Sequence, residues 1–130
     1  MILLDTHVVI WLALSPEKIS PAATAAIRES ELAGEIQGIS VMTIYEVANA
    51  IRLGRLQPAV PHPVFLNRIK SRFKVFPVSE TIALCAAELP APFHGDPMDR
   101  IITATALVAN CTLITKDEKI REANLCKVVW

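Results

Sequence analysis

Five carboxylate side chains occupy positions from which they could do chemistry, namely Asp5, Glu46, Asp96, Asp99 and Asp117. Asp96 and Asp99 are three residues apart and directly precede an apolar run that begins at Ile101. Two interpretations of this pair are open. The acids could cap the helix that the run predicts, because a carboxylate accepts hydrogen bonds from the amides of a first turn. They could also be half of a metal site.

Capping by itself is a sufficient explanation for three of these acids. Asp5 follows the short apolar run 2–4, and Asp117 follows the run 113–115; each precedes an expected helix. Asp96 stands directly before a proline, which is a favoured arrangement at a helix start. Taken one at a time, these three acids are predicted to be caps.

Asp99 and Glu46 are harder to explain as caps. Asp99 would project from the first turn of a helix that is apolar nearly all round, where an unpaired charge is costly. Arg100 points about 100° away from it on the helical wheel and is a poor partner. Glu46 lies inside the expected helix 43–53, opposite its main apolar stripe, which leaves an exposed face or the wall of a cleft as alternatives.

Jointly, the acids point to a cation site. Four or five of them, from distant segments, fall at helix starts or first turns, in a fold that gathers those starts at one edge. Clustered carboxylates repel one another unless cations or protons hold them. Oxygen ligands without cysteine suit Mg²⁺ or Mn²⁺. The three histidines, His7, His62 and His94, show no ligand spacing. His94 is either a residue that lines the cleft or an ordinary loop residue.

Short apolar runs alternate with helical patterns along the chain, which predicts an α/β fold. Strands are expected at 2–4, 35–40, 74–78, 111–115 and 127–129. Helices are expected at 7–14, 21–32, 43–53, 64–73, 79–89, from residue 96 onward, and at 118–123, with proline-rich loops at 57–63 and 90–95. This order favours a mostly parallel sheet of about five strands covered on both faces. Ligands bind such a sheet at the carboxyl ends of its strands.

Length and composition predict one compact domain over residues 1–130, with 52% hydrophobic and 20% charged residues. No apolar stretch approaches the ~20 residues that span a bilayer, and the first residues lack the basic segment of a signal peptide. The three cysteines, Cys85, Cys111 and Cys126, have no zinc-binding spacing. They suggest buried thiols in a reducing cytoplasm.

Charge is unevenly distributed, although the net charge is zero. Residues 47–79 contain no acid, and the rest of the chain has a corresponding acidic excess. The basic residues of this stretch are Arg52, Arg55, Arg68, Lys70, Arg72 and Lys74. They could contact the phosphates of a nucleic acid, or they could be an ordinary solvated face.

Four short motifs carry a family resemblance. They are Leu3-Leu-Asp5-Thr-His, Thr43-Ile-Tyr-Glu46-Val-Ala, His94-Gly-Asp-Pro-Met-Asp99-Arg-Ile-Ile-Thr-Ala-Thr-Ala and Leu113-Ile-Thr-Lys-Asp117. In this order they resemble a PIN-domain ribonuclease, and in particular a VapC-type toxin of a bacterial toxin–antitoxin pair. The resemblance runs from the first expected strand to the last, and it implies the α/β/α sandwich of that family.

The resemblance also implies roles for single residues. Asp5, Glu46, Asp99 and Asp117 correspond to the four catalytic and metal-binding acids, with Mg²⁺ or Mn²⁺ as the cofactor. Asp96 is an additional acid, expected to be a cap or a supporting group. Thr6 and Thr115 match hydroxyl positions beside the first and fourth acids, and Tyr45 stands where close relatives often have tryptophan.

The implied activity is endoribonuclease cleavage of RNA by a metal-activated water. The implied partners are a second copy of the chain, with which it forms a homodimer, and a small antitoxin whose C-terminal part covers the site. Exposed apolar residues such as Met42 and Leu53 are compatible with such contacts. No membrane association is expected.

Three other classes of protein are alternatives to this interpretation. A phosphatase of the haloacid dehalogenase type needs a second aspartate two residues after Asp5, where His7 stands. A phospho-receiver domain needs paired acids near the first strand, and Asp5 has no such neighbour. The non-enzymatic alternative is an interaction module in which all the acids are helix caps.

Overall fold

A five-stranded parallel sheet forms the centre of the molecule. The structure is a computed structural model that describes residues 1–91, 93 and 95–130. The strands are β1 (Ile2–Leu4), β2 (Gly38–Ser40), β3 (Lys74–Phe76), β4 (Thr112–Ile114) and β5 (Val128–Val129). They lie in the order β3-β2-β1-β4-β5, and every pairing is parallel. The predicted α/β fold with a parallel sheet is confirmed.

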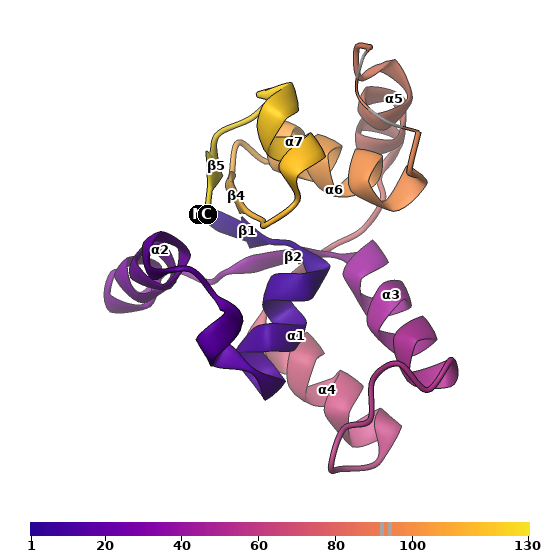
Figure 1. Cartoon of the computed structure of the whole chain (residues 1–130). Coiled ribbons are helices and arrows are strands. Elements are labelled where there is room, and N and C mark those ends of the chain that lie inside the picture. Colours follow the sequence, from indigo (N-terminus) through magenta and orange to yellow (C-terminus); the bar gives the residue numbers. More distant parts are fainter. Residues whose placement is uncertain (92, 94) are drawn as a thin grey trace.

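Helices cover both faces of this sheet (Figure 1). One face carries α1 (Thr6–Leu14), α2 (Pro21–Leu32), α3 (Val41–Arg52) and α4 (His62–Arg72), with a 3-10 turn at Pro16–Lys18. The other face carries α5 (Glu80–Glu88), α6 (Pro97–Val108) and α7 (Glu118–Ala123). The molecule is therefore a three-layer α/β/α sandwich.

Alternation along the central strands divides the core between the two faces. Leu4 of β1 and Ile114 of β4 pack among the residues of α1 to α4. Their neighbours Leu3 and Leu113 point the other way and pack with Ile102 of α6 on the opposite face. Because successive side chains of a strand point to opposite faces, three-residue strands suffice to supply both halves of the core.

The parallel topology gathers the strand ends at one edge. The chain leaves β1 at Asp5 and enters α1 at once, and the Asp5 amide still pairs with the Ile114 carbonyl of β4 at 3.0 Å. It leaves β2 at Ser40 and enters α3 in the same way. Since carboxyl ends of parallel strands share an edge, residues far apart in the sequence meet there.

Most expected elements are present, with shifted ends. The ranges Pro21–Leu32 and Glu118–Ala123 are found as predicted. The first strand is also found as predicted, at Ile2–Leu4, whereas the other four are shorter than expected, and β2 begins at Gly38 rather than at residue 35. The helix expected from residue 64 begins earlier, at His62, because a proline is tolerated in the first turn, where amides need no helical partner.

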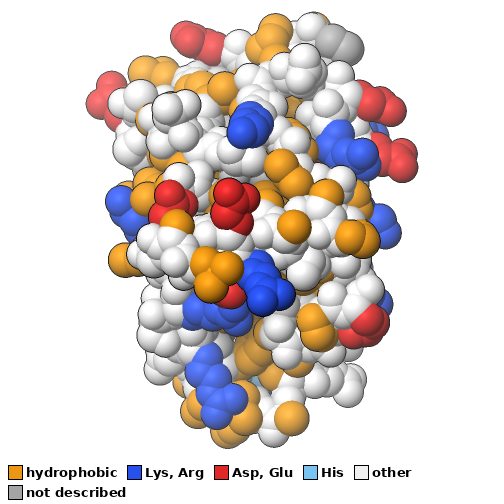
Figure 2. Space-filling view, turned by 90° about the vertical axis from the view of Figure 1, so that its left-hand side faces the viewer, with side chains coloured by type: hydrophobic (Ala, Val, Ile, Leu, Met, Phe, Trp, Pro, Cys, Tyr) orange, Lys and Arg blue, Asp and Glu red, His pale blue; other side chains and the backbone are white. Residues whose placement is uncertain are grey.

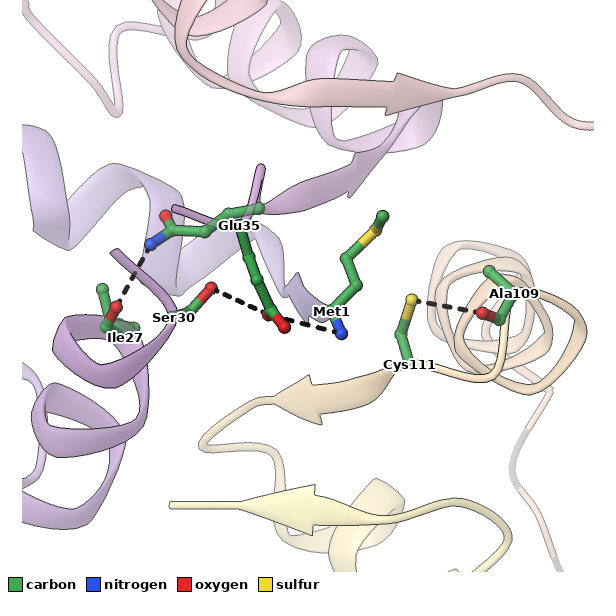
Figure 3. A network of polar contacts seen from close by, with 7 residues as sticks. Met1, Ile27, Ser30, Glu35, Ala109 and Cys111 are labelled. Atoms are coloured by element: carbon green, nitrogen blue, oxygen red, sulfur yellow. Dashed lines mark hydrogen bonds and ion pairs between the residues drawn. The ribbon is translucent and has the colours of Figure 1, made fainter. Parts of the chain in front are cut away.

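The amino edge of the sheet, opposite the strand ends just described, is joined by polar contacts (Figure 3). The Met1 amino group lies 3.4 Å from a Glu35 carboxylate oxygen, and the Ser30 hydroxyl donates to the same oxygen at 3.4 Å. The Cys111 thiol donates to the Ala109 carbonyl at 3.6 Å, and burial raises the pKa of that thiol. These contacts stabilise the amino edge of the sheet, and the acid that takes part in them is Glu35.

The cysteines agree only in part with the expectation of buried thiols. Cys111 is buried, Cys85 and Cys126 are half-buried, and all three are free thiols. Within residues 1–91, 93 and 95–130, no helix has the length and apolar character that crossing a bilayer requires.

Gly38 is expected to be intolerant of a side chain. A Cβ on this buried strand residue would lie 2.6 Å from a ring carbon of Phe76 and 3.2 Å from a methyl of Leu3. Gly38→Ala should lower the free energy of unfolding by about 1–3 kcal/mol, because overpacking displaces neighbours in a dense core. Urea unfolding measures the change. Gly95→Ala is the control, since a Cβ there meets no described atom within 4 Å. Equal stability of the two variants would refute the packing argument.

Candidate active site

Asp5 is the buried acid at the centre of the strand-end edge, with a side chain that is only 5% exposed. Its Oδ1 accepts a hydrogen bond from the Thr6 amide at 2.7 Å, which caps α1, and its Oδ2 accepts one from the Thr115 hydroxyl at 2.7 Å. Burial raises the pKa of Asp5, the two hydrogen bonds oppose that rise, and nearby Asp117 adds to it. The carboxylate is thus held in one orientation by two different segments.

Glu46 is tied to the same edge through Thr6. The Thr6 hydroxyl donates to Glu46 Oε1 at 2.6 Å and lies 3.2 Å from the Thr43 hydroxyl. Burial raises the pKa of Glu46, the Thr6 hydrogen bond lowers it, and the charge of Asp5 raises it further. Glu46 is half-buried and lines a hollow with Thr6, so of the two alternatives for this residue the structure favours a cleft wall.

Thr115 joins two acids. While its hydroxyl donates to Asp5, its oxygen accepts from the Asp117 amide at 3.0 Å. Asp117 in turn caps α7, with its Oδ1 accepting from the Ile120 amide at 2.9 Å. The end of β4 and the start of α7 are therefore locked to the end of β1.

Asp99 interacts electrostatically with all four of the other acids. Burial and then the charges of Asp96, Asp5, Asp117 and Glu46, in decreasing order, together raise its pKa to about 7. An aspartate normally titrates near 4. Five acids thus repel one another at this edge, and we call them the acidic cluster: Asp99, Asp96 from the start of the same helix, and Asp5, Glu46 and Asp117 from three other segments.

Asp96 and Asp99 differ in burial and in hydrogen bonding at the start of α6. Asp96 is exposed and its Oδ1 accepts from the amides of Met98 at 2.9 Å and Asp99 at 3.2 Å, so it is the helix cap. Asp99 is half-buried in the first turn. The cap of α6 is therefore supplied by Asp96 and not by Asp99.

Arg100 positions this helix start, a role that the sequence did not reveal. Its guanidinium donates to four backbone carbonyls, those of Ala86 at 2.9 Å, Leu89 at 3.0 Å, Ala87 at 3.2 Å and Phe93 at 3.4 Å. These carbonyls belong to the end of α5 and the segment after it, where helical partners are missing. The contacts fasten the first turn of α6, and with it Asp99, to the neighbouring helix.

The acids surround open space. One hollow of about 580 Å³ is lined by Asp96, Asp99 and Asp117, and another of about 340 Å³ by Asp5 and Asp117. Within the described residues, no three acids, histidines or cysteines lie close enough to enclose a metal ion as they stand. Mg²⁺ keeps several waters and binds through one or two carboxylates, so an open ring of oxygen donors fits its chemistry.

Three of the six basic residues expected to contact a nucleic acid line two different hollows. Arg55 lines the hollow that contains Glu46, whereas Arg68 and Arg72 line a separate, largely apolar hollow of about 380 Å³ between α1 and α4. Arg72 also pairs with Glu31 at 3.3 Å. On the face drawn in Figure 2, lysine and arginine side chains are interspersed with acidic and apolar ones.

The histidines have different surroundings. His7 is exposed beside Asp5 and contacts the ring of Trp11, with 5.7 Å between centroids. His62 is exposed in the first turn of α4. His94, expected to line the cleft or to be an ordinary loop residue, lies outside the residues that the structure describes.

Comparison with known proteins identifies the family of this chain and agrees with its fold. The family model for the PIN domain matches residues 2–124. Ribonuclease VapC22 of Mycobacterium tuberculosis is 34% identical over 121 residues, covering 92% of this chain and 89% of that protein. The chain therefore belongs to the PIN-domain family. The predicted resemblance to VapC-type proteins is confirmed.

Solved structures share the whole fold. A structure of VapBC2 from Rickettsia felis bound to a promoter DNA fragment has a TM-score of 0.73 at 16% identity, covering 98% of this chain and 97% of that chain. FitAcB from Neisseria gonorrhoeae has a TM-score of 0.69 at 25% identity, covering 98% and 96%. A toxin–antitoxin complex from Klebsiella pneumoniae has a TM-score of 0.65 at 24% identity, covering 100% and 97%.

The raised pKa of Asp99 has a consequence for stability. The native state holds this proton more tightly than the unfolded chain, so the contribution of Asp99 falls as the pH rises from about 4 to about 7 and stays low above that. In metal-free buffer, Asp99→Asn should therefore be more stable than the wild type at about pH 8, and the gain should disappear near pH 4. Urea unfolding at both pH values measures it. Glu17→Gln, which changes an exposed acid outside the cluster, should show no such gain. A gain independent of pH would contradict the assignment.

Proposed function

We propose that this protein is a metal-dependent endoribonuclease that acts as the toxin of a toxin–antitoxin pair. The family membership and the relative named Ribonuclease VapC22 support nuclease activity. The observation that carries the proposal is the acidic cluster, in which Asp99 has a pKa of about 7 because four other carboxylates add to the effect of its burial. Such a group favours a divalent cation, since a bound cation offsets the repulsion between the carboxylates.

The proposed ligands are Asp5, Glu46, Asp99 and Asp117. When bound, one or two Mg²⁺ or Mn²⁺ ions would activate a water and offset the charge of the phosphodiester transition state. The chain's own part is to hold oxygen donors in place before substrate arrives. Hydrogen bonds from threonine hydroxyls orient Asp5 and Glu46, and such supporting contacts are typical of metal-binding carboxylates.

A capping module is the second candidate, and one observation favours it. Asp5, Asp96 and Asp117 each accept hydrogen bonds from amides at the start of a helix. Capping uses only part of a carboxylate's capacity, however, since each carboxylate has about four acceptor sites. Glu46 lies within α3 and caps nothing, and the cap of α6 is already supplied by Asp96. A scaffold that needs only caps gives no reason for those two acids.

The proposed partners are an RNA substrate, an antitoxin protein and a second copy of the chain, in the cytoplasm. Three of the structural relatives are solved as toxin–antitoxin or VapBC complexes. Leu53 is exposed and Met42 half-exposed on α3 and the turn after it, which is compatible with a protein contact. The antitoxin is proposed to cover the acidic cluster.

Replacing single acids tests the mechanism. Asp99→Asn and Glu46→Gln should each lower the rate of RNA cleavage in Mg²⁺ by a factor on the order of 100 or more, because a charge that holds the cation is lost. Gel analysis of a labelled single-stranded RNA measures the rate. Glu17→Gln should cleave like the wild type, and excess chelator should stop all cleavage.

Folding must be monitored beside activity, since a misfolded variant would also be inactive. Circular dichroism should show both variants folded, with Asp99→Asn at least as stable as the wild type at neutral pH. Cleavage at the wild-type rate by either variant, or cleavage unaffected by chelator, would refute the metal mechanism and leave the capping module as the explanation of the acids.

A further inference from the structure

Trp11 stands where two hollows beside the acidic cluster meet. One hollow, of about 490 Å³, lies between α1 and α3 and also contains Glu46. The other, of about 340 Å³, also contains Asp5 and Asp117. His7 and Trp11 of α1 line both hollows, so the indole lies in the wall of both, and we call the two hollows together the path beside the acids.

The indole is anchored on one side and accessible on another. It contacts the Trp130 ring at 5.8 Å and the His7 ring at 5.7 Å, and it is partly buried in the core below. The Lys116 ammonium lies over it, 5.5 Å from the ring. Lys116 is an exposed residue with a long side chain, and it also lines the smaller hollow. A flat ligand that displaced this flexible cation could reach the aromatic face that the cation covers.

Basic groups continue along the same path. Lys18 and Arg55 are exposed and line the larger hollow, whereas Lys116 lines the smaller one. Each of the two hollows therefore has positive side chains and carboxylates in its lining, and the aromatic ring of Trp11 lies in the wall of both. A polyanion with flat, apolar rings along it matches that combination of groups, as single-stranded nucleic acid does.

We infer that Trp11 is a stacking platform for an unpaired nucleobase next to the scissile phosphate, with Lys18, Arg55 and Lys116 holding neighbouring phosphates. This inference rests on the proposed nuclease function and specifies its substrate as single-stranded or looped RNA, because a base inside a duplex has no free face. Stacking on an aromatic ring is tolerant of sequence, so the site selects unpaired bases rather than one base.

A direct test uses the fluorescence of Trp11 itself. The chain has two tryptophans, so Trp130→Phe leaves Trp11 as the single emitter and keeps an aromatic ring beside it. Asp99→Asn in the same chain prevents cleavage during the titration. A single-stranded oligouridylate decamer should quench Trp11 emission, whereas an abasic ribose-phosphate decamer of the same charge should bind without quenching.

Substitution of the ring tests its contribution to affinity. Trp11→Leu keeps apolar bulk against the core but removes the stacking face, and it should weaken oligouridylate binding about tenfold. It should leave the affinity for the abasic decamer unchanged. Trp11→Phe should recover part of the loss, and circular dichroism checks that each variant is folded.

The outcomes separate this inference from the proposed function. Suppose that the wild type cleaves RNA, and that Trp11→Leu loses affinity equally for both decamers or loses none for either. Trp11 is then not a stacking platform, and the proposed nuclease function stands. If the wild type cleaves no single-stranded RNA in Mg²⁺, the proposed nuclease function itself is wrong. A peptide occupant of this path would give no quenching by either decamer, which also overturns the inference.

Discussion

Repulsion between carboxylates at the strand-end edge is the constraint on which the rest of the molecule depends. A parallel sheet brings the ends of β1, β2 and β4 together; the ends of β1 and β4 lead into helices capped by Asp5 and Asp117, and the end of β2 leads into the helix that contains Glu46. Burial raises the pKa of Asp5, Glu46 and Asp99, and each feels the charge of at least one other acid. The fold keeps these groups together at a cost in stability, which is typical of sites organised for function.

The same acids also help to build the fold. Asp5, Asp96 and Asp117 satisfy amides at the starts of α1, α6 and α7, so removing any one of them would weaken a helix start as well as the charge cluster. Thr6 and Thr115 connect these local contacts across the sheet, because their hydroxyls reach Glu46 and Asp5, 40 and 110 residues away in the chain. Capping and cation binding are thus compatible uses of one set of side chains.

Much of this arrangement was predictable from local patterns. Asp96 before Pro97 predicted the cap of α6, and alternating apolar runs predicted the parallel sheet and its two covered faces. The contact between Glu46 and Thr6 was not predictable, because it depends on how α1 and α3 lie beside each other. The role of Arg100 was missed for a related reason, since its acceptors are backbone carbonyls, which leave no signal in a sequence. The six basic residues formed one group in the chain, but three of them line two different hollows in space.

Direct titration of the Asp99 carboxyl tests the central claim. Carbon NMR of ¹³C-labelled protein, with the signal assigned by its absence from Asp99→Asn, reports the protonation of this group alone. Without divalent ions, the midpoint should lie at about 7, and millimolar Mg²⁺ should move it to lower pH, because a bound cation favours the charged form. A midpoint near 4 that Mg²⁺ does not move would show that these carboxylates neither crowd one another nor share a cation.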